Sequence, residues 1–163
     1  MLIGILADSH NQIERLDAAL EMLDSLGARV IFHCGDVGSI EAFEALTAYE
    51  CYVVLGNTDR LASPVRKKLA ETSVTLLEPG DPVEINGKQI ALAHGHLRSK
   101  MEKYIASQEL DYLLHGHSHK TRDERFGRTR VICPGALERA TLKTVATLDV
   151  RRDRLQFHFL QKW

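Results

Sequence analysis

Apolar and polar positions alternate along the first half of the chain in a way that separates strands from helices. Short apolar runs rich in branched residues predict buried strands at residues 2–7, 30–34 and 51–55, the last of them apolar on both faces and therefore central in a sheet. Between these runs, apolar residues recur at helical spacing over 13–26 and 42–46, and Ser63-Pro64 predicts the start of a third helix. This order is typical of an α/β layer architecture.

The second half of the chain changes to an antiparallel pattern. Residues 83–85 and 89–93 flank Asn86-Gly87, a pair that favours a type I′ turn, and so predict a hairpin. A helix is expected over 101–107, a short strand over 112–114, and an antiparallel pair over 145–160 with a break near Arg152-Asp153. The sheets should therefore be mixed. No repeat or flexible linker divides the sequence, so residues 1–163 are expected to form a single domain.

Composition narrows the class of protein further. A chain of 163 residues with 44% hydrophobic content is long enough for one buried core, and a formal charge of −1 gives no field that would recruit long nucleic acid. The opening apolar run stops at Asp8 and has no basic lead, so it predicts neither a signal peptide nor a membrane span. Three cysteines without paired spacing, Cys34, Cys51 and Cys133, indicate a reduced, cytoplasmic protein.

Five of the predicted strands end in side chains that could hold or support a divalent cation. In open α/β sheets, ligands bind outside the carboxyl ends of the strands, where loops from separate strands meet. The sequence therefore predicts one shared site built from five segments. They are Asp8-Ser9-His10, Gly35-Asp36, Gly56-Asn57-Thr58-Asp59, His94-Gly95-His96 and Gly116-His117-Ser118-His119.

Taken singly, several of these segments have ordinary structural explanations. Asp-Ser-His can be a helix N-cap beside a surface histidine, and Gly-Asp and Gly-Asn are common turns. The histidines are harder to explain in that way, because five of the eight lie within residues 94–96 and 115–119. They leave open a site for a single structural zinc ion. His33, inside an apolar strand, is expected to support the core, and His158, between two phenylalanines, to be exposed.

Carboxylates, imidazoles and an amide in one site suit the hydrolysis of phosphate esters. A catalyst must neutralise the phosphoryl oxygens and generate hydroxide near neutral pH, and two cations about 3.5–4 Å apart do both. An anionic ligand between the cations offsets their repulsion, and Asp36 is the candidate for this bridge. The nitrogen-rich ligand set favours two divalent transition-metal ions, manganese first, with iron, cobalt, nickel or zinc as alternatives.

The order of these segments resembles the calcineurin-like metallophosphoesterase superfamily, and the likeness runs from Asp8 to His119. The short length, without a cap domain, is most similar to the small phosphodiesterases of the YfcE type. The resemblance implies a four-layer α-β-β-α sandwich with two mixed β-sheets, and a small phosphodiester or phosphomonoester as substrate. It also implies one metal held by Asp8, His10 and His119, a second held by Asn57, His94 and His117, and Asp36 shared between them.

The family mechanism implies in-line attack on phosphorus by a metal-bridging hydroxide, with Asn57 and His96 stabilising the charge that develops. Asp59 is expected to accept a hydrogen bond from a ligand histidine and to fix its tautomer. Many family members have a histidine directly after the asparagine, thought to protonate the leaving group, where this chain has Thr58. Because threonine is a poor acid at neutral pH, we expect a preference for aryl or otherwise activated phosphodiesters. Residues 133–136 depart from the family's Asn-Pro-Gly-Ser and are expected to shape the edge of the site.

A non-catalytic protein is the second interpretation of the same resemblance. The scaffold subunit of the retromer complex has this fold and works chiefly by binding partner proteins. A scaffold has no need of seven metal ligands, which favours the enzyme. Basic residues near 60–68 and 120–130 either steer an anionic substrate or form a solvated charged face with acids such as Asp123 and Glu124. The sequence leaves a homo-oligomer open.

Overall fold

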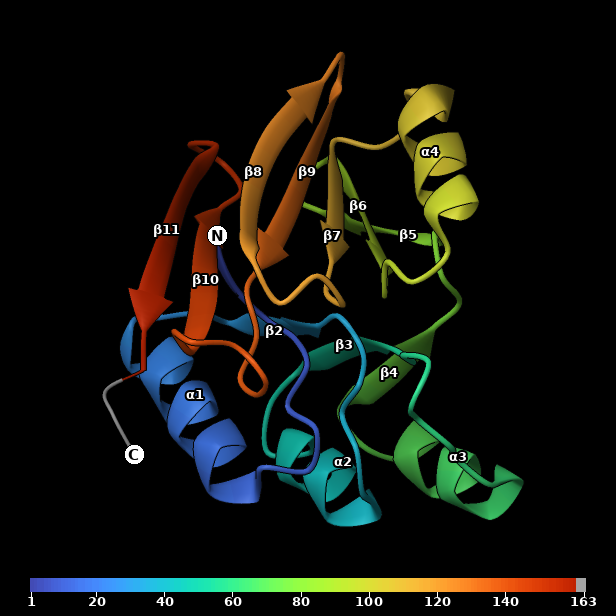
Figure 1. Ribbon diagram of the computed structural model, residues 1–163, viewed down its shortest axis with the longest axis vertical. Helices are drawn as coiled ribbons and strands as arrows, with labels where there is room; N and C mark the ends of the chain where they lie inside the picture. Colours follow the sequence, from blue (N-terminus) through green and yellow to red (C-terminus); the bar gives the residue numbers. More distant parts are fainter. Residues whose placement is uncertain (161–163) are drawn as a thin grey trace.

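The computed structural model describes residues 1–160 and contains two mixed β-sheets packed face to face (Figure 1). The first sheet is formed by β1 (Leu2–Leu6), β2 (Val30–His33), β3 (Cys51–Val54), β4 (Val74–Leu77), β10 (Thr144–Asp149) and β11 (Arg154–Phe159). The second is formed by β5 (Pro82–Ile85), β6 (Lys88–Ala93), β7 (Tyr112–His115), β8 (Thr121–Phe126) and β9 (Thr129–Pro134). The helices are α1 (Ile13–Ser25), α2 (Ile40–Leu46), α3 (Ser63–Ala70) and α4 (Arg98–Ser107). None of these helices has the length and apolar character that crossing a bilayer requires.

The first sheet is parallel where helices connect its strands and antiparallel at one edge. Its order is β11-β10-β1-β2-β3-β4, and β10 runs antiparallel to both of its neighbours. Helices α1, α2 and α3 return the chain to the start of the next strand, which parallel pairing requires. Leu20 of α1, Phe43 of α2 and Leu69 of α3 belong to one apolar cluster with Ile31 and Val53 of the sheet. The three helices therefore cover the outer face of this sheet (Figure 1).

A second apolar cluster fills the space between the two sheets. Ile5 and Phe32 of the first sheet pack in this cluster with Leu92 and Leu114 of the second, whose strand order is β5-β6-β7-β9-β8. On the far side of the second sheet, Met101 of α4 packs in a third cluster. Figure 1 shows α4 apart from the other helices. The four-layer α-β-β-α sandwich with two mixed sheets is therefore confirmed.

The turn between β5 and β6 has the geometry that its sequence predicts. Asn86 and Gly87 have φ values of 52° and 72°, both in the left-handed region. Ile85 pairs with Lys88 across the turn, so the loop has two residues. Positive φ at both central positions defines a type I′ turn, whose twist matches that of the flanking strands. The predicted hairpin is confirmed.

The charged segment 120–130 forms a hairpin, and the exposed side chains of β8 make it a charged face. β8 is an edge strand paired with β9, and its side chains are mostly exposed, which removes the apolar alternation that would have revealed it. The charges also serve the fold. Arg130 makes a two-point ion pair with Asp123 (2.7 and 2.8 Å) and contacts Asp153 at 2.6 Å. Strand β4 was likewise not predicted from the sequence, because it has only four residues and a single buried position.

His158 is half-buried, which corrects the expectation that it is exposed. Phe157 packs toward the cluster between the sheets, so the alternation of β11 places His158 on the opposite face. There its Nε2 lies 2.8 Å from Thr147 Oγ1 of β10. Side chains on both faces of this edge strand therefore contact other parts of the protein.

Asp111 makes the stability of the fold depend on pH. Burial alone would raise the pKa of Asp111, but Arg128, the backbone N–H of Gln89 and Lys88 outweigh burial and lower the pKa to about 2. A carboxylate with a depressed pKa stabilises the fold above its unfolded pKa near 3.8, and this contribution is lost as the pH falls toward 2.

We therefore expect Asp111→Asn to lower the free energy of unfolding by about 1–2 kcal/mol at pH 7. The difference between the two proteins should shrink between pH 4 and pH 2, where the native carboxylate becomes protonated. Urea unfolding at pH 7, 4 and 2.5 measures this. A difference that stays constant with pH would mean that packing, not charge, explains the loss.

Candidate metal centre

The segments predicted to carry ligands lie at the carboxyl ends of parallel strands. Asp8 and Asp36 follow β1 and β2, Asn57 follows β3, and the histidine pairs follow β6 and β7. Hydrogen bonds tie these loops together. Asp8 N–H donates to Gly35 O at 3.0 Å, and Asp8 Oδ2 accepts from His117 N–H at 2.9 Å. The second bond joins loops of the two sheets, so segments far apart in sequence meet at one place.

The main chain of the ligand loops adopts an uncommon conformation. Five of the seven predicted ligands have left-handed φ values, between 44° and 65°. This region costs an L-residue on the order of 1 kcal/mol, because the Cβ atom crowds the backbone. Such residues persist only where the surrounding structure determines their conformation, and they cluster at binding and active sites. The five are Asp8, His10, Asp36, His117 and His119.

The two carboxylates lie among imidazoles from both sheets. Asp36 Oδ2 is 3.7 Å from His10 Nε2 and 3.4 Å from His94 Nε2, so a single oxygen atom faces histidines that follow β1 and β6. Asp8 Oδ1 is 3.5 Å from His119 Nε2. Ligand atoms that lie within 4.8 Å of one another form two groups, Asp8 with His10 and His119, and Asp8 with Asp36 and His94. Each group has about the size of one coordination sphere.

Two buried polar atoms of this site have no hydrogen-bond partner within residues 1–160, Asp8 Oδ1 and His10 Nε2. Leaving such a group unpartnered costs about 1–3 kcal/mol. Burial, with added repulsion from Asp36, raises the pKa of Asp8 to about 7, although the hydrogen bond from His117 opposes this. A divalent cation would satisfy both atoms and stabilise the carboxylate form of Asp8. These residues therefore fit a cation.

The main chain fixes the tautomer of His94. Its Nδ1 lies 2.9 Å from Cys34 O, which can only accept, so Nδ1 carries the proton and Nε2 presents a lone pair. Asn57 Oδ1, another acceptor, lies 3.0 Å from that Nε2. Two acceptors at this distance repel each other unless a cation contacts both. The ring of His117 is close to this pair, with its centroid 5.1 Å from that of His94.

Arg139 contributes to the site through its main chain, and sequence analysis did not identify it. Its carbonyl oxygen lies 3.3 Å from His119 Nδ1, which directs the other ring nitrogen of His119 toward Asp8. Arg139 itself has a left-handed φ of 56°. A main-chain acceptor has no signature in residue type, so only the fold could reveal this contact.

His33 supports the loop that carries Asp36, as expected of a residue inside an apolar strand. It is fully buried, and its Nδ1 accepts from Gly35 N–H at 3.2 Å. Nε2 therefore donates to Ser9 Oγ at 3.0 Å, and Ser9 donates in turn to Val37 O at 3.0 Å. Burial lowers the pKa of His33 to about 3, so the ring is neutral. This chain of hydrogen bonds connects the loops after β1 and β2.

We expect His33→Gln to lower the free energy of unfolding by about 1–3 kcal/mol without changing the number of bound metal ions, since it disrupts this chain but removes no ligand. Thermal unfolding and metal analysis of the same sample test this. His158→Gln is a matched control, because His158 is only half-buried and should cost less. If the folded His33→Gln protein bound fewer ions than the native protein, His33 would be a ligand.

Asp59 has a different role from the one expected. Its Oδ1 accepts from Gly38 N–H at 3.0 Å and its Oδ2 accepts from Gly56 N–H at 2.8 Å, so both oxygens bond to main chain and not to a histidine ring. Asp59 is buried and connects the loops after β2 and β3. It therefore positions the segments that carry Asp36 and Asn57.

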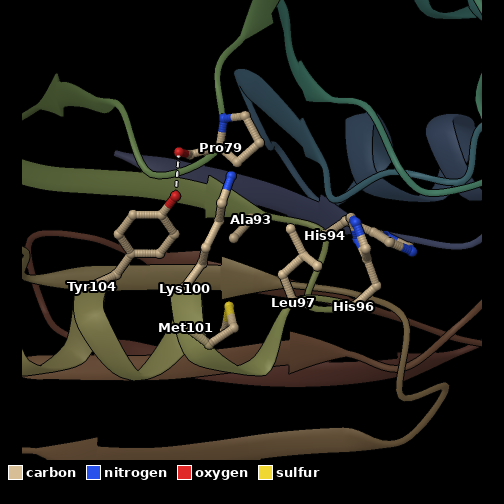
Figure 2. Close-up of a pocket in the computed structure, with 9 residues that line it drawn as sticks. Pro79, Ala93, His94, His96, Leu97, Lys100, Met101 and Tyr104 are labelled. Atoms are coloured by element: carbon tan, nitrogen blue, oxygen red, sulfur yellow. Dashed lines mark hydrogen bonds between the residues drawn. The ribbon is translucent and has the colours of Figure 1, made fainter.

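His96 lies at the open side of the site. Its ring is exposed, with the centroid 5.4 Å from that of His94 and 6.1 Å from that of His117. Figure 2 shows the rings of His94 and His96 side by side, next to a small pocket of about 30 Å³ lined by Leu97 and Lys100. The pocket has room for no more than about one water molecule.

The segment 133–136 leads directly into residues that contact the loop after β1. Directly after it, Leu137 N–H and Glu138 N–H donate to Ala7 O and Asp8 O at 3.1 and 3.0 Å. Glu138 is also ion-paired with Arg15 of α1. These contacts hold the loop after β1 in place.

Comparisons with known proteins agree with this geometry. Residues 1–153 match the calcineurin-like phosphoesterase superfamily domain. Phosphodiesterase MJ0936 of Methanocaldococcus jannaschii is 30% identical over 139 residues, which are 83% of each chain.

Solved structures show the same architecture. An archaeal phosphodiesterase superposes with a TM-score of 0.87 at 25% identity, covering 98% of this chain and 100% of that one. YfcE, a phosphoesterase from E. coli, has a TM-score of 0.69 at 17% identity over 99% and 100% of the chains. Zinc-bound Vps29 from Entamoeba histolytica has a TM-score of 0.68 at 18% identity over 98% of each chain. The last two likenesses concern the fold alone.

Proposed function

The chain belongs to the calcineurin-like phosphoesterase superfamily, and we propose that it hydrolyses small phosphodiesters with the help of two bound divalent cations. It is a metal-dependent phosphoesterase by family. The two-metal proposal rests on Asp36 Oδ2, which lies within 4 Å of both His10 Nε2 and His94 Nε2. His10 belongs to one of the two ligand groups and His94 to the other, which favours two cations over one.

The ligands divide into two sets around Asp36. Asp8, His10 and His119 would hold the first cation, in line with their mutual distances and the unpartnered Asp8 Oδ1 and His10 Nε2. Asn57, His94 and His117 would hold the second, in line with the two acceptors 3.0 Å apart. Asp36 would be shared between both sets. A carboxylate oxygen of Asp8 also lies within 4.8 Å of ligand atoms of Asp36 and His94, so its charge would strengthen the negative potential between the cations.

When bound, the two cations supply hydroxide from water near neutral pH for in-line attack on phosphorus, and they neutralise the phosphoryl oxygens. The chain itself positions these partners. Asn57 and His96 are both exposed at the site, and the Asn57 amide nitrogen and the His96 ring would donate hydrogen bonds to charge that develops on the phosphoryl group. Buried Asp8, Asp36 and His94 hold the ligand atoms in fixed positions. Thr58 offers no proton to the leaving oxygen, so activated diesters are the preferred substrates.

The chemistry of the ligands supports transition-metal ions over magnesium or calcium. Imidazole nitrogen outnumbers carboxylate oxygen in the set, which suits manganese, iron, cobalt, nickel or zinc. We place manganese first among them. The three cysteines are buried and free, which supports a reduced, cytoplasmic location.

Metal removal and return test this function. The protein is stripped with a chelator, loaded with Mn²⁺, Ni²⁺ or Zn²⁺, and assayed with bis(p-nitrophenyl) phosphate against p-nitrophenyl phosphate. We expect no hydrolysis by the stripped protein, recovery with two equivalents of metal, and faster hydrolysis of the diester. The stripped protein should remain folded by circular dichroism, since three apolar clusters stabilise it without metal.

Two results would contradict the proposal. Full occupancy by two cations without turnover of either ester would favour a non-catalytic scaffold. Unfolding on chelation, with recovery on one equivalent of zinc, would instead indicate a single structural zinc site.

A further inference from the structure

A second cavity, of about 490 Å³, borders the metal centre on the outer side of the second sheet. It lies between α4 and β8, and His117 lines it, so it begins at a ligand of the second cation. Met101 and Ile105 of α4 and Phe126 of β8 give it apolar walls. A cavity of this size holds a small organic group.

His115, which lines this cavity, has an unused hydrogen-bond acceptor. The residue is only 5% exposed and lines the cavity next to His117. Its Nδ1 lies 3.0 Å from Gly116 O, so Nδ1 carries the proton of the ring. Nε2 is buried and has no partner within residues 1–160. With the ring proton on Nδ1, Nε2 presents its lone pair. A group that reaches this nitrogen from the cavity gains a hydrogen bond if it brings an N–H or O–H.

The wall formed by β8 suits a flat ring. The guanidinium of Arg122 lies over the ring of Phe126, with 5.5 Å between Arg122 Cζ and the ring centroid. Glu124 holds the guanidinium from the side at 2.7 Å. Guanidinium planes and phenyl rings both stack on planar aromatic groups. Phe126 is 38% exposed, which leaves part of its ring open to contact.

We propose that this cavity binds one substituent of the phosphodiester, and that this substituent carries a planar ring with an N–H or O–H donor, the chemistry of a nucleobase. The inference rests on the proposed function, because it places phosphorus at the metal centre beside His117. The donor satisfies His115 Nε2, the ring stacks against Arg122 and Phe126, and Met101 contacts its edge. An alkyl or acyl chain would fill the same walls but would leave His115 Nε2 without a partner.

Two diesters with the same leaving group test the proposal. Thymidine 5′-(p-nitrophenyl phosphate) carries a base with a ring N–H, whereas ethyl p-nitrophenyl phosphate has no ring on its second substituent. For the metal-loaded native protein we expect a KM about 10-fold lower for the thymidine ester. His115→Phe removes the acceptor and Arg122→Met removes the guanidinium. Each should abolish most of this preference. Arg29→Met, an exposed residue before β2 at the opposite end of the strand, is the matched control and should keep it.

The outcomes distinguish the proposed binding in the cavity from the proposed activity. The binding proposal would be overturned, and the activity would stand, if the native protein had equal KM values for the two esters. It would also be overturned if the preference survived both variants. If neither ester is hydrolysed, the proposed activity fails. Binding of thymidine to the native protein, measured by NMR, then tests the cavity by itself. Binding that Arg122→Met abolishes and Arg29→Met retains would uphold it. Absence of binding, or equal binding to all three proteins, would overturn it.

Discussion

Asp36→Asn should reduce hydrolysis of bis(p-nitrophenyl) phosphate by about 10³-fold or more and lower the metal content below two ions per chain. Asp36 Oδ2 lies between His10 and His94, and its other oxygen accepts from Thr58 N–H at 2.9 Å. Burial alone would raise the pKa of Asp36, but the hydrogen bonds from Thr58 and the nearby histidines lower it, so it provides a full negative charge. An amide would remove that charge from between the two proposed cations, a loss of several kcal/mol in the transition state.

Asp111→Asn is the matched control for this substitution. Asp111 precedes β7 and lies at the opposite end of the strand from the ligand histidines, so this variant should keep two metal ions and native kcat. Metal analysis and steady-state kinetics on both variants make the comparison. Equal metal content in the native protein and Asp36→Asn would rule out Asp36 as the bridge.

Thr58→His should accelerate the hydrolysis of diesters with basic leaving groups by about 10²-fold, while p-nitrophenyl esters change little. Thr58 is exposed directly after Asn57, and the hydrogen bond from its backbone N–H to Asp36 holds the residue next to the site. An imidazole there can protonate an alkoxide or phenoxide as it departs, whereas p-nitrophenolate needs no proton. The native protein lacks such an acid at this position.

The dependence of kcat on the pKa of the leaving group measures this effect. A series of aryl diesters should give a steep dependence for the native protein and a flatter one for Thr58→His. Thr58→Gln, which is polar but cannot act as an acid, is the control and should keep the native slope. A shallow slope already in the native protein would mean that another group, such as His96, protonates the leaving oxygen. A steep slope that Thr58→His leaves unchanged would mean that a side chain at position 58 does not act on the leaving oxygen.

The predictable parts of the fold are those that are buried on a regular period. β1, β2 and β3 are apolar on both faces because helices cover one side and the second sheet covers the other, and their sequences show it. β8 could not be found in the same way, since an exposed edge strand needs no apolar residues. Its pairing with β9 depends on partners such as Arg130 and Asp123 that only the fold brings together.

The composition of the site could be predicted better than its support. Polar side chains that end parallel strands must converge, which is why Asp8, Asp36 and His94 could be grouped from sequence. The role of Asp59 could not be predicted, because the sequence does not show whether a carboxylate accepts a hydrogen bond from a histidine ring or from a main-chain N–H. The carbonyl of Arg139 and the unpartnered nitrogen of His115 depend on three-dimensional contacts alone.

The left-handed φ values at Asp8, His10, Asp36, His117 and His119 should affect how these positions change during evolution. Glycine would adopt these φ values without strain, so a carboxylate or imidazole at these positions lowers the stability of the fold. Stabilising substitutions are therefore available there once function no longer opposes them. In lineages freed from the need for hydrolysis, these positions should be among the first to revert to glycine or asparagine. Their persistence in a descendant would record that selection still acts on its chemistry.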